Sequence, residues 1–211
     1  QRFDLALFKI TPGVDDGPVV AQRSFYYTEF DDITVSYHRS SLAMADMICQ
    51  VLETPQALGG GKHQPEGAFY YPQRLPDDGR VDWTFPQSSI ARHCRALTAP
   101  YPGLKTSDQD VEITLWQCQP FDDAIDGSCG TISVCFLSGD FLVNCLDGRL
   151  LVRKWSATKS EWRPRVGIIL KSELFAVQLG KIVERHELRY PDQLISPRIK
   201  RWCDFRNFEG S

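Results

Sequence analysis

The sequence predicts an α/β portion followed by a small all-β barrel within 211 residues. Before residue 106, short strand-like runs alternate with segments of helical periodicity. After it, alternating apolar runs are joined by short glycine-containing turns, which is typical of antiparallel β structure. We therefore expect three parts: an α/β part with its linker at 1–105, a barrel-like part at 106–164 and an unassigned basic tail at 165–211.

Two strands and a helix are predicted near the N-terminus. The runs FDLALFKI and VVAQRSFYY flank a turn rich in Gly, Pro and Asp, so each should be a strand. A helix should follow Asp31 and Asp32, because a carboxylate there can cap its first turn. Apolar residues then recur at three- and four-residue steps and should form the buried face of this helix. They are Leu42, Ala45, Ile48, Cys49 and Leu52.

A segment without periodicity follows from 54 to 86 and is predicted to be a surface-wrapping or functional loop. The next stretch, PQSSIARHCRAL, places Ile90, Cys94 and Leu97 on one side of a short helix. That helix should end at TAPYPG, since two prolines and a glycine cannot continue it.

Four strand-like runs account for the barrel-like part, and the last three are linked by the turns SGD and DG. The glycines of these turns supply the positive φ that a hairpin needs. The runs are VEITLWQCQ, GTISVCFL, DFLVNCL and RLLVRKWSA. Beyond residue 165 the sequence predicts one helix around SELFAVQLG and then an irregular basic end.

Composition narrows the class of protein. With 42% hydrophobic and 24% charged residues the chain is an ordinary globular one. No apolar run reaches the roughly 20 residues that cross a bilayer, so we expect a cytoplasmic protein without a membrane partner. Seven cysteines without a C-x-x-C pair predict reduced thiols and no metal site. The run GGGKH lacks the spacing and the Ser or Thr of a phosphate-binding loop.

Charge is distributed unevenly along the chain. Residues 1–148 hold 10 Lys and Arg against 20 Asp and Glu, whereas residues 149–211 hold 14 against 7. A basic end can attract polyanions such as nucleic acid. Its charges are mixed with acids, however, so a tail folded back onto the acidic body of the same chain is an equally open interpretation.

The turn PGVDDGPVVAQ is the sharpest candidate for chemistry. Asp15 and Asp16 lie between two predicted strands, next to Gly17, which permits a tight turn and the close approach of a ligand. A carboxylate fixed there can orient a histidine, hold a water or receive a proton from an attacking amine. Asp-Gly is also ordinary turn chemistry, so a purely structural role for Asp15 stays open on these residues alone.

Several segments, in this order, resemble the folate-dependent formyltransferase family. They are GVDDGPVVAQ, FYYPQRLPDDGRVDW, RALTAPYPG and ITLWQC. The family includes methionyl-tRNA formyltransferase, the formyltransferase domains of nucleotide-sugar modification enzymes and the hydrolase part of formyltetrahydrofolate dehydrogenase. The resemblance implies the C-terminal part of a formyltransferase-like α/β domain, an OB-like barrel after it, and 10-formyltetrahydrofolate as the co-substrate.

Carried over by position, the resemblance implies roles for five residues. Asp15 matches the aspartate of the family's Asn-His-Asp catalytic constellation, and Gly17 matches the glycine two residues on. In that family the aspartate tunes the histidine and assists proton movement as an amine attacks the formyl carbon. Tyr71, Arg74 and Asp82 match the loop that closes the catalytic body onto the linker, where structural and substrate-contacting roles overlap.

The family's Asn-x-His and its folate-contacting segment do not occur in these 211 residues, whose only asparagines are Asn144 and Asn207. On this comparison the chain begins just before the catalytic aspartate and lacks most of the formyl-donor site. The resemblance leaves open a missing N-terminal half or a homodimer as the partner, and whether the chain alone is an enzyme.

The expected acceptor is a small molecule with a primary amine, and a nucleotide-linked amino sugar is favoured. TAPYPG resembles the sugar-modifying members, and an acidic body suits a small ligand better than RNA. Methionyl-tRNA is the alternative acceptor, which the basic tail supports. An interpretation of another class is a non-catalytic binding or assembly module in which Asp15 is only a turn residue.

Overall fold

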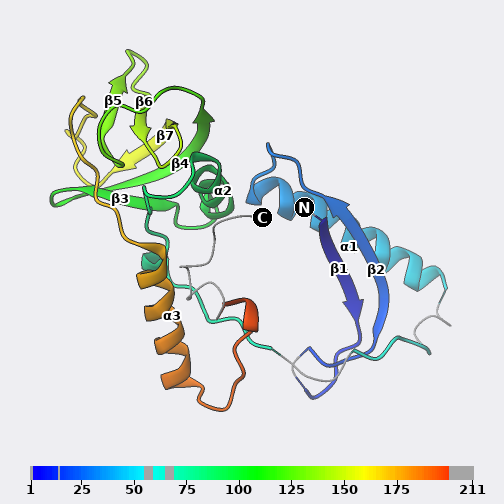
Figure 1. The fold of residues 1–211 in the computed structure, drawn as a ribbon. Helices are drawn as coiled ribbons and strands as arrows, with labels where there is room; N and C mark the ends of the chain where they lie inside the picture. The colour runs from blue at the N-terminus through cyan, green and yellow to red at the C-terminus, as the bar shows by residue number, and fades with distance from the viewer. Residues whose placement is uncertain (1, 14, 55–58, 65–68, 200–211) are drawn as a thin grey trace. The chain divides into compact units, whose positions relative to one another are not determined.

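The computed structural model describes residues 2–13, 15–54, 59–64 and 69–199 (Figure 1). The chain divides into two compact units, Gln1–Gly67 and Ala68–Ser211, each with its own sheet. Within these described ranges, no helix has the length and apolar character needed to span a membrane.

A hairpin and one helix make up the first unit. Strands β1 (Arg2–Phe8) and β2 (Val19–Tyr26) pair in antiparallel register, and α1 (Ile33–Glu53) contacts both. The predicted cap of the helix is confirmed, since Oδ1 of Asp32 accepts a hydrogen bond from the backbone N of Val35 at 2.9 Å. Both strands and the helix therefore form where the sequence predicted them.

The buried face of α1 differs from the prediction. The residues that pack inward are Ser36, Ser40, Ala43, Met47 and Val51. The predicted face is wrong, because its residues are exposed: Leu42, Ala45, Ile48, Cys49 and Leu52. Both stripes repeat at helical spacing, so periodicity does not distinguish them. Hydrophobicity alone favours the more apolar stripe as the buried one.

An antiparallel five-stranded sheet in the order β3-β4-β7-β6-β5 lies at the centre of the second unit. Its strands are β3 (Leu104–Asp108), β4 (Val111–Phe121), β5 (Ile132–Cys135), β6 (Phe141–Asn144) and β7 (Arg149–Ala157). The four predicted runs are confirmed as strands, whereas β3 was missed because LKTSD is short and mostly polar. In the described part the sheet is open, with β3 and β5 at its edges, so a closed OB-like barrel stays a prediction.

The main core of the second unit lies between this sheet and α2 (Gln87–Leu97), the predicted short helix. Ile90, Ala91 and Cys94 of α2 are buried there, and so is Trp83, which is fully enclosed. Packing therefore joins α2 and Trp83 to the sheet. The predicted domain boundary at 105/106 stays a prediction.

The two predicted turns use their glycines differently. Gly139 has a φ of 91°, as the prediction of a positive φ requires. Gly148 instead allows a close approach, since an added Cβ would lie 2.4 Å from Nε2 of Gln87. Gln87 also starts α2, where its backbone N donates to Oδ1 of Asp147 at 2.8 Å. The turn between β6 and β7 thus fixes the beginning of α2.

The helix predicted in the tail is confirmed as α3 (Phe175–Arg189), which is longer than expected. Leu179 and Ile182 of this helix are buried. Arg185 of α3 forms an ion pair with Asp78 at 2.6 Å, so this part of the basic tail does fold back onto the acidic body.

Cysteine chemistry in the described part is that of free thiols. Burial raises the pKa of Cys145 to about 12, so this thiol is not reactive as a thiolate near neutral pH. The free cysteines are Cys49, Cys94, Cys118, Cys129, Cys135 and Cys145, while Cys203 lies outside the described residues. The same part of the chain contains no group of three His, Cys, Asp or Glu side chains placed to hold a metal.

Candidate functional site

The turn between β1 and β2 holds Asp15 in the left-handed conformation, with a φ of 53°. Aspartate tolerates this region better than most residues because its short side chain can hydrogen-bond locally. The residue is exposed, and within the described ranges no partner for its carboxylate is found. The turn therefore presents a solvent-accessible carboxylate at the end of a hairpin.

Two features fix the shape of this turn. Nε2 of Gln64 donates to the backbone oxygens of Asp15, at 2.6 Å, and of Gly17, at 2.9 Å. Gly17 is buried, and an added Cβ would lie only 1.7 Å from the backbone oxygen of Lys9. The glycine of the Asp-x-Gly pattern is therefore required for packing. Sequence reasoning missed Gln64, because nothing in its Gly- and Pro-rich surroundings marks it.

The other three predicted site residues lie on the segment 69–83 of the second unit. Tyr71 is 60% exposed, and its hydroxyl lies 3.5 Å from Oγ of Ser196. Asp82 is buried, and its two carboxylate oxygens accept from the backbone N of Thr84, at 3.0 Å, and of Phe175, at 2.8 Å. Asp82 thus uses both oxygens inside the protein, where it fixes the first residue of α3.

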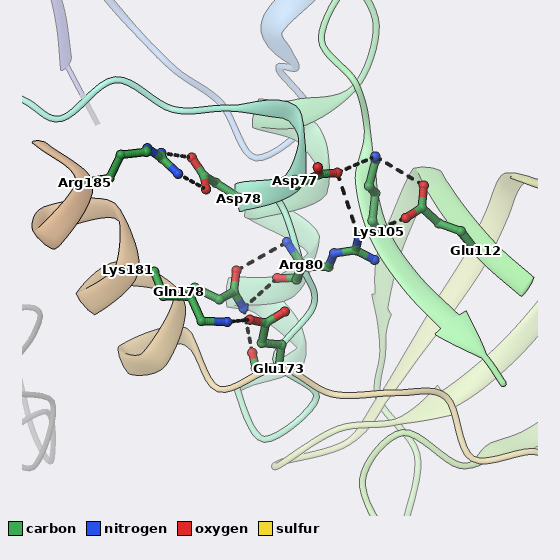
Figure 2. A network of polar contacts seen from close by, with 9 residues as sticks. All are labelled: Asp77, Asp78, Arg80, Lys105, Glu112, Glu173, Gln178, Lys181 and Arg185. Atoms are coloured by element: carbon green, nitrogen blue, oxygen red, sulfur yellow. Dashed lines mark hydrogen bonds and ion pairs between the residues drawn. The ribbon is translucent and has the colours of Figure 1, made fainter. Parts of the chain in front are cut away.

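Arg74 is the predicted site residue with an exposed charge. Its Nη2 donates to the backbone oxygen of Asp78 at 2.8 Å, while its side chain stays half exposed. Asp78 belongs to a short 3-10 helix, η2 (Pro76–Asp78), and binds Arg185 through both carboxylate oxygens, at 3.2 and 2.6 Å (Figure 2). Burial lowers the pKa of Arg74. The positive charge of Arg185 lowers this pKa further, whereas the negative charge of Asp78 raises it.

A second set of charges lies beside this one. Arg80 and Lys105 share the carboxylates of Asp77 and Glu112, with N–O distances from 2.9 to 3.8 Å (Figure 2). Two cations here face two carboxylates, so the set is balanced. A cavity of about 200 Å³ opens beside it. Its lining residues are Arg80, Lys105, Thr106, Ser107, Lys171 and Glu173.

Helix α3 also binds the backbone of this segment. Nε2 of Gln178 donates to the backbone oxygens of Arg80, at 3.2 Å, and of Glu173, at 2.6 Å, and its Oε1 accepts from the backbone N of Arg80 at 3.3 Å (Figure 2). Sequence reasoning missed Gln178 and Arg185, because a helical period marks a buried stripe but not which segment it meets.

His93 of α2 packs against two aromatic rings, which also contact each other at 5.6 Å between centroids. Its ring stacks on Phe175 with centroids 5.7 Å apart, and the ring of Phe85 is 6.3 Å away. Burial lowers the pKa of His93, the charges of Arg92 and Arg74 add to this, and Asp82 opposes it. No sequence pattern marks this cluster, since a lone histidine on a short helix is usually structural.

The structure thus brings together three of the five predicted site residues. Tyr71, Arg74 and Asp82 share one segment of the second unit, whereas Asp15 and Gly17 share one turn of the first unit. The roles of all five in binding or catalysis stay predictions.

Comparison with known proteins finds a family that part of the second unit resembles. Residues 75–163 match the model of the family described as formyl transferase, C-terminal domain. This stretch covers η2, α2 and the whole five-stranded sheet. The resemblance to the formyltransferase family is therefore confirmed, and this segment, of mixed helix and sheet, is similar to formyl transferase C-terminal domains.

Solved structures show the same fold over more of the chain. HypX from Aquifex aeolicus, in complex with tetrahydrofolic acid, aligns with 92% of this chain and 32% of its own at 17% identity and a TM-score of 0.61. An N-formyltransferase from Helicobacter canadensis, in complex with folinic acid and dTDP-3-aminofucose, aligns with 72% and 55% at 13% identity and a TM-score of 0.54. The chain thus spans about a third of the length of HypX.

His93 predicts a pH dependence of stability in the second unit. Because folding lowers its pKa from the ordinary value of 6.5, the unfolded chain takes up the proton first as the pH falls. The contribution of His93 to the free energy of unfolding should therefore be complete above about pH 6.5, and the free energy of unfolding should decrease below that pH. Urea unfolding followed by tryptophan fluorescence on either side of this pH measures the effect.

His93→Phe keeps an aromatic ring packed against Phe85 and Phe175 and should remove this component of the pH dependence. His38→Phe, at an exposed position of α1, is the matched control and should leave it in place. An unchanged acid destabilisation in His93→Phe would show that His93 is not its source.

Proposed function

We propose that this chain is part of an N-formyltransferase that moves a formyl group from 10-formyltetrahydrofolate to a primary amine. The observation that carries the proposal is the exposed carboxylate of Asp15, held on a rigid turn with Gly17 two residues later, in the motif order of the formyltransferase family. Neighbours of the same fold were solved with tetrahydrofolic acid and with folinic acid, which supports a folate donor.

Formyl transfer to an amine requires a group that can accept a proton. A neutral amine attacks the formyl carbon, and the nitrogen must lose a proton as the tetrahedral intermediate collapses toward the formamide and tetrahydrofolate. A carboxylate on a fixed turn can accept that proton or orient a histidine that does so. The oxyanion donors are the Asn and His of the family, which these 211 residues do not supply in the family's pattern.

The acceptor proposed is an amino sugar linked to a nucleotide. One neighbour of the same fold was solved with dTDP-3-aminofucose. The second unit offers a half-exposed arginine, Arg74, and an exposed tyrosine, Tyr71, on the same segment, and such groups suit a phosphate and a base or sugar ring. Closure of the five-stranded sheet into an OB-like barrel remains part of the same proposal.

Asp15→Asn tests the catalytic role. Asparagine has the same shape and tolerates the left-handed conformation, so the turn should persist while the proton acceptor is lost. Formyl transfer by the complete gene product should fall by about 10²–10⁴-fold, the usual contribution of general acid–base catalysis. Asp16→Asn, at the neighbouring exposed carboxylate, is the control and should stay close to the unsubstituted protein.

Turnover that survives Asp15→Asn would refute the catalytic assignment. A complete gene product that binds the folate donor but transfers no formyl group would favour the alternative of a non-catalytic binding module in which Asp15 only shapes the turn.

Binding across a salt series separates the small acceptor from tRNA. Contacts to RNA phosphates release counterions, so an RNA-binding surface loses affinity steeply as salt rises. Under the proposal, the protein formylates the amino-sugar nucleotide and shows no measurable affinity for tRNA even at low salt. Strong tRNA binding with a steep salt slope would support methionyl-tRNA as the acceptor and contradict the sugar assignment.

A further inference from the structure

The charges around Asp78 are out of balance. Two guanidinium groups, of Arg74 and Arg185, share this single carboxylate, which leaves one positive charge over. Arg92 and Asp82 also act electrostatically on the neighbouring His93, and their opposite charges cancel each other. Among the described residues, the two guanidinium groups that contact Asp78 therefore have one carboxylate between them.

The neighbouring ion-pair network around Arg80 and Lys105 has no such excess of positive charge. Arg80 and Lys105 face the two carboxylates of Asp77 and Glu112, so every charge there has a counterpart in the same chain. Figure 2 shows the balanced set next to the Asp78–Arg185 pair. The excess charge at Asp78 is thus a local property and does not follow from a generally basic surface.

The excess charge falls on Arg74. Arg185 satisfies both carboxylate oxygens of Asp78 and also donates to the backbone oxygen of Gln73 at 3.0 Å. Among the described residues, Arg74 makes polar contacts with Asp78 alone: its Nη2 donates to the backbone oxygen at 2.8 Å, and its Nε lies 3.9 Å from Oδ2. The remaining N–H groups of its fork are free to bind a planar or tetrahedral anion.

We propose that Arg74 is a phosphate-binding subsite, and that Arg185 of α3 is the residue that positions it by holding Asp78. A guanidinium that is fixed at one edge and exposed at the other binds phosphate with two parallel hydrogen bonds and little loss of side-chain entropy. The identity of the ligand as the phosphate of the nucleotide-linked acceptor rests on the proposed function. The subsite itself does not.

Arg185 acts through Asp78 in two ways. Oδ2 of Asp78 also accepts from the backbone N of Leu75 at 2.6 Å, so the carboxylate closes η2 directly after Arg74. Without Arg185, Asp78 would turn its full charge toward Arg74 and cancel the field that attracts an anion. The positioning residue thus lies in α3, beyond the stretch that matches the family model.

Calorimetric titration with inorganic pyrophosphate, and with a nucleoside diphosphate, tests the subsite without any formyl donor. Arg74→Ala should weaken binding by about tenfold or more, the loss expected for a charged hydrogen-bonding group. The matched control is Arg153→Ala, because Arg153 is equally exposed and pairs with one carboxylate, Asp140, at 3.6 Å. This control should bind as the unsubstituted protein does.

Two further variants distinguish an effect of charge on pyrophosphate binding from an effect of misfolding. Arg185→Ala should weaken binding, while Asp78→Asn, which removes the shared negative charge, should bind as tightly as the unsubstituted protein or more tightly. The proposal is overturned if Arg74→Ala binds pyrophosphate as tightly as Arg153→Ala does. It is also overturned if Asp78→Asn weakens binding as much as Arg74→Ala does, provided that urea titration shows both variants to be folded. Loss of pyrophosphate binding in Arg74→Ala, in a complete gene product that transfers no formyl group, would leave the subsite standing and reject the formyltransferase assignment.

Discussion

The segment from Tyr70 to Trp83 depends on hydrogen bonds that other elements supply, and the candidate site of the second unit depends on that segment. A chain with little regular structure must still satisfy its backbone polar groups. On one side, the backbone N of Val81 donates to Lys105 of β3 at 2.9 Å; on the other, Trp83 N donates to Oγ of Ser172 at 2.9 Å. The residues before α3 and the helix itself are thus structural parts of the site.

This arrangement separates the two predicted clusters of functional residues. Asp15 and Gly17 lie on a turn that Gln64 holds from within the first unit, whereas Arg74 is held by η2 and α3 in the second unit. Each cluster is rigid for its own local reasons. The proposals assign a carboxylate for proton transfer to the first cluster and an arginine for a phosphate to the second.

Much of the fold followed from the sequence, and the failures have physical causes. Alternation and glycine turns predicted four strands of the sheet, since a half-buried strand must alternate. Periodicity predicted α1 but assigned its exposed stripe to the core. Two stripes of α1 share the helical period, and a local pattern does not show which of them meets a packing partner. The pairing of Arg185 with Asp78 bridges more than a hundred residues of chain, and no local pattern marks it. Motif order predicted Asp15, while Gln64 and His93 needed the structure.

Hydrogen–deuterium exchange of single amides tests most directly whether α3 holds the segment. The amide of Leu75 donates to Asp78, which Arg185 fixes, whereas the amide of Val81 donates to β3. In Arg185→Ala, the account predicts that exchange at Leu75 becomes faster while exchange at Val81 stays unchanged. Unchanged exchange at Leu75 in this variant would contradict the account, because the turn at Leu75 would then hold its shape without Arg185.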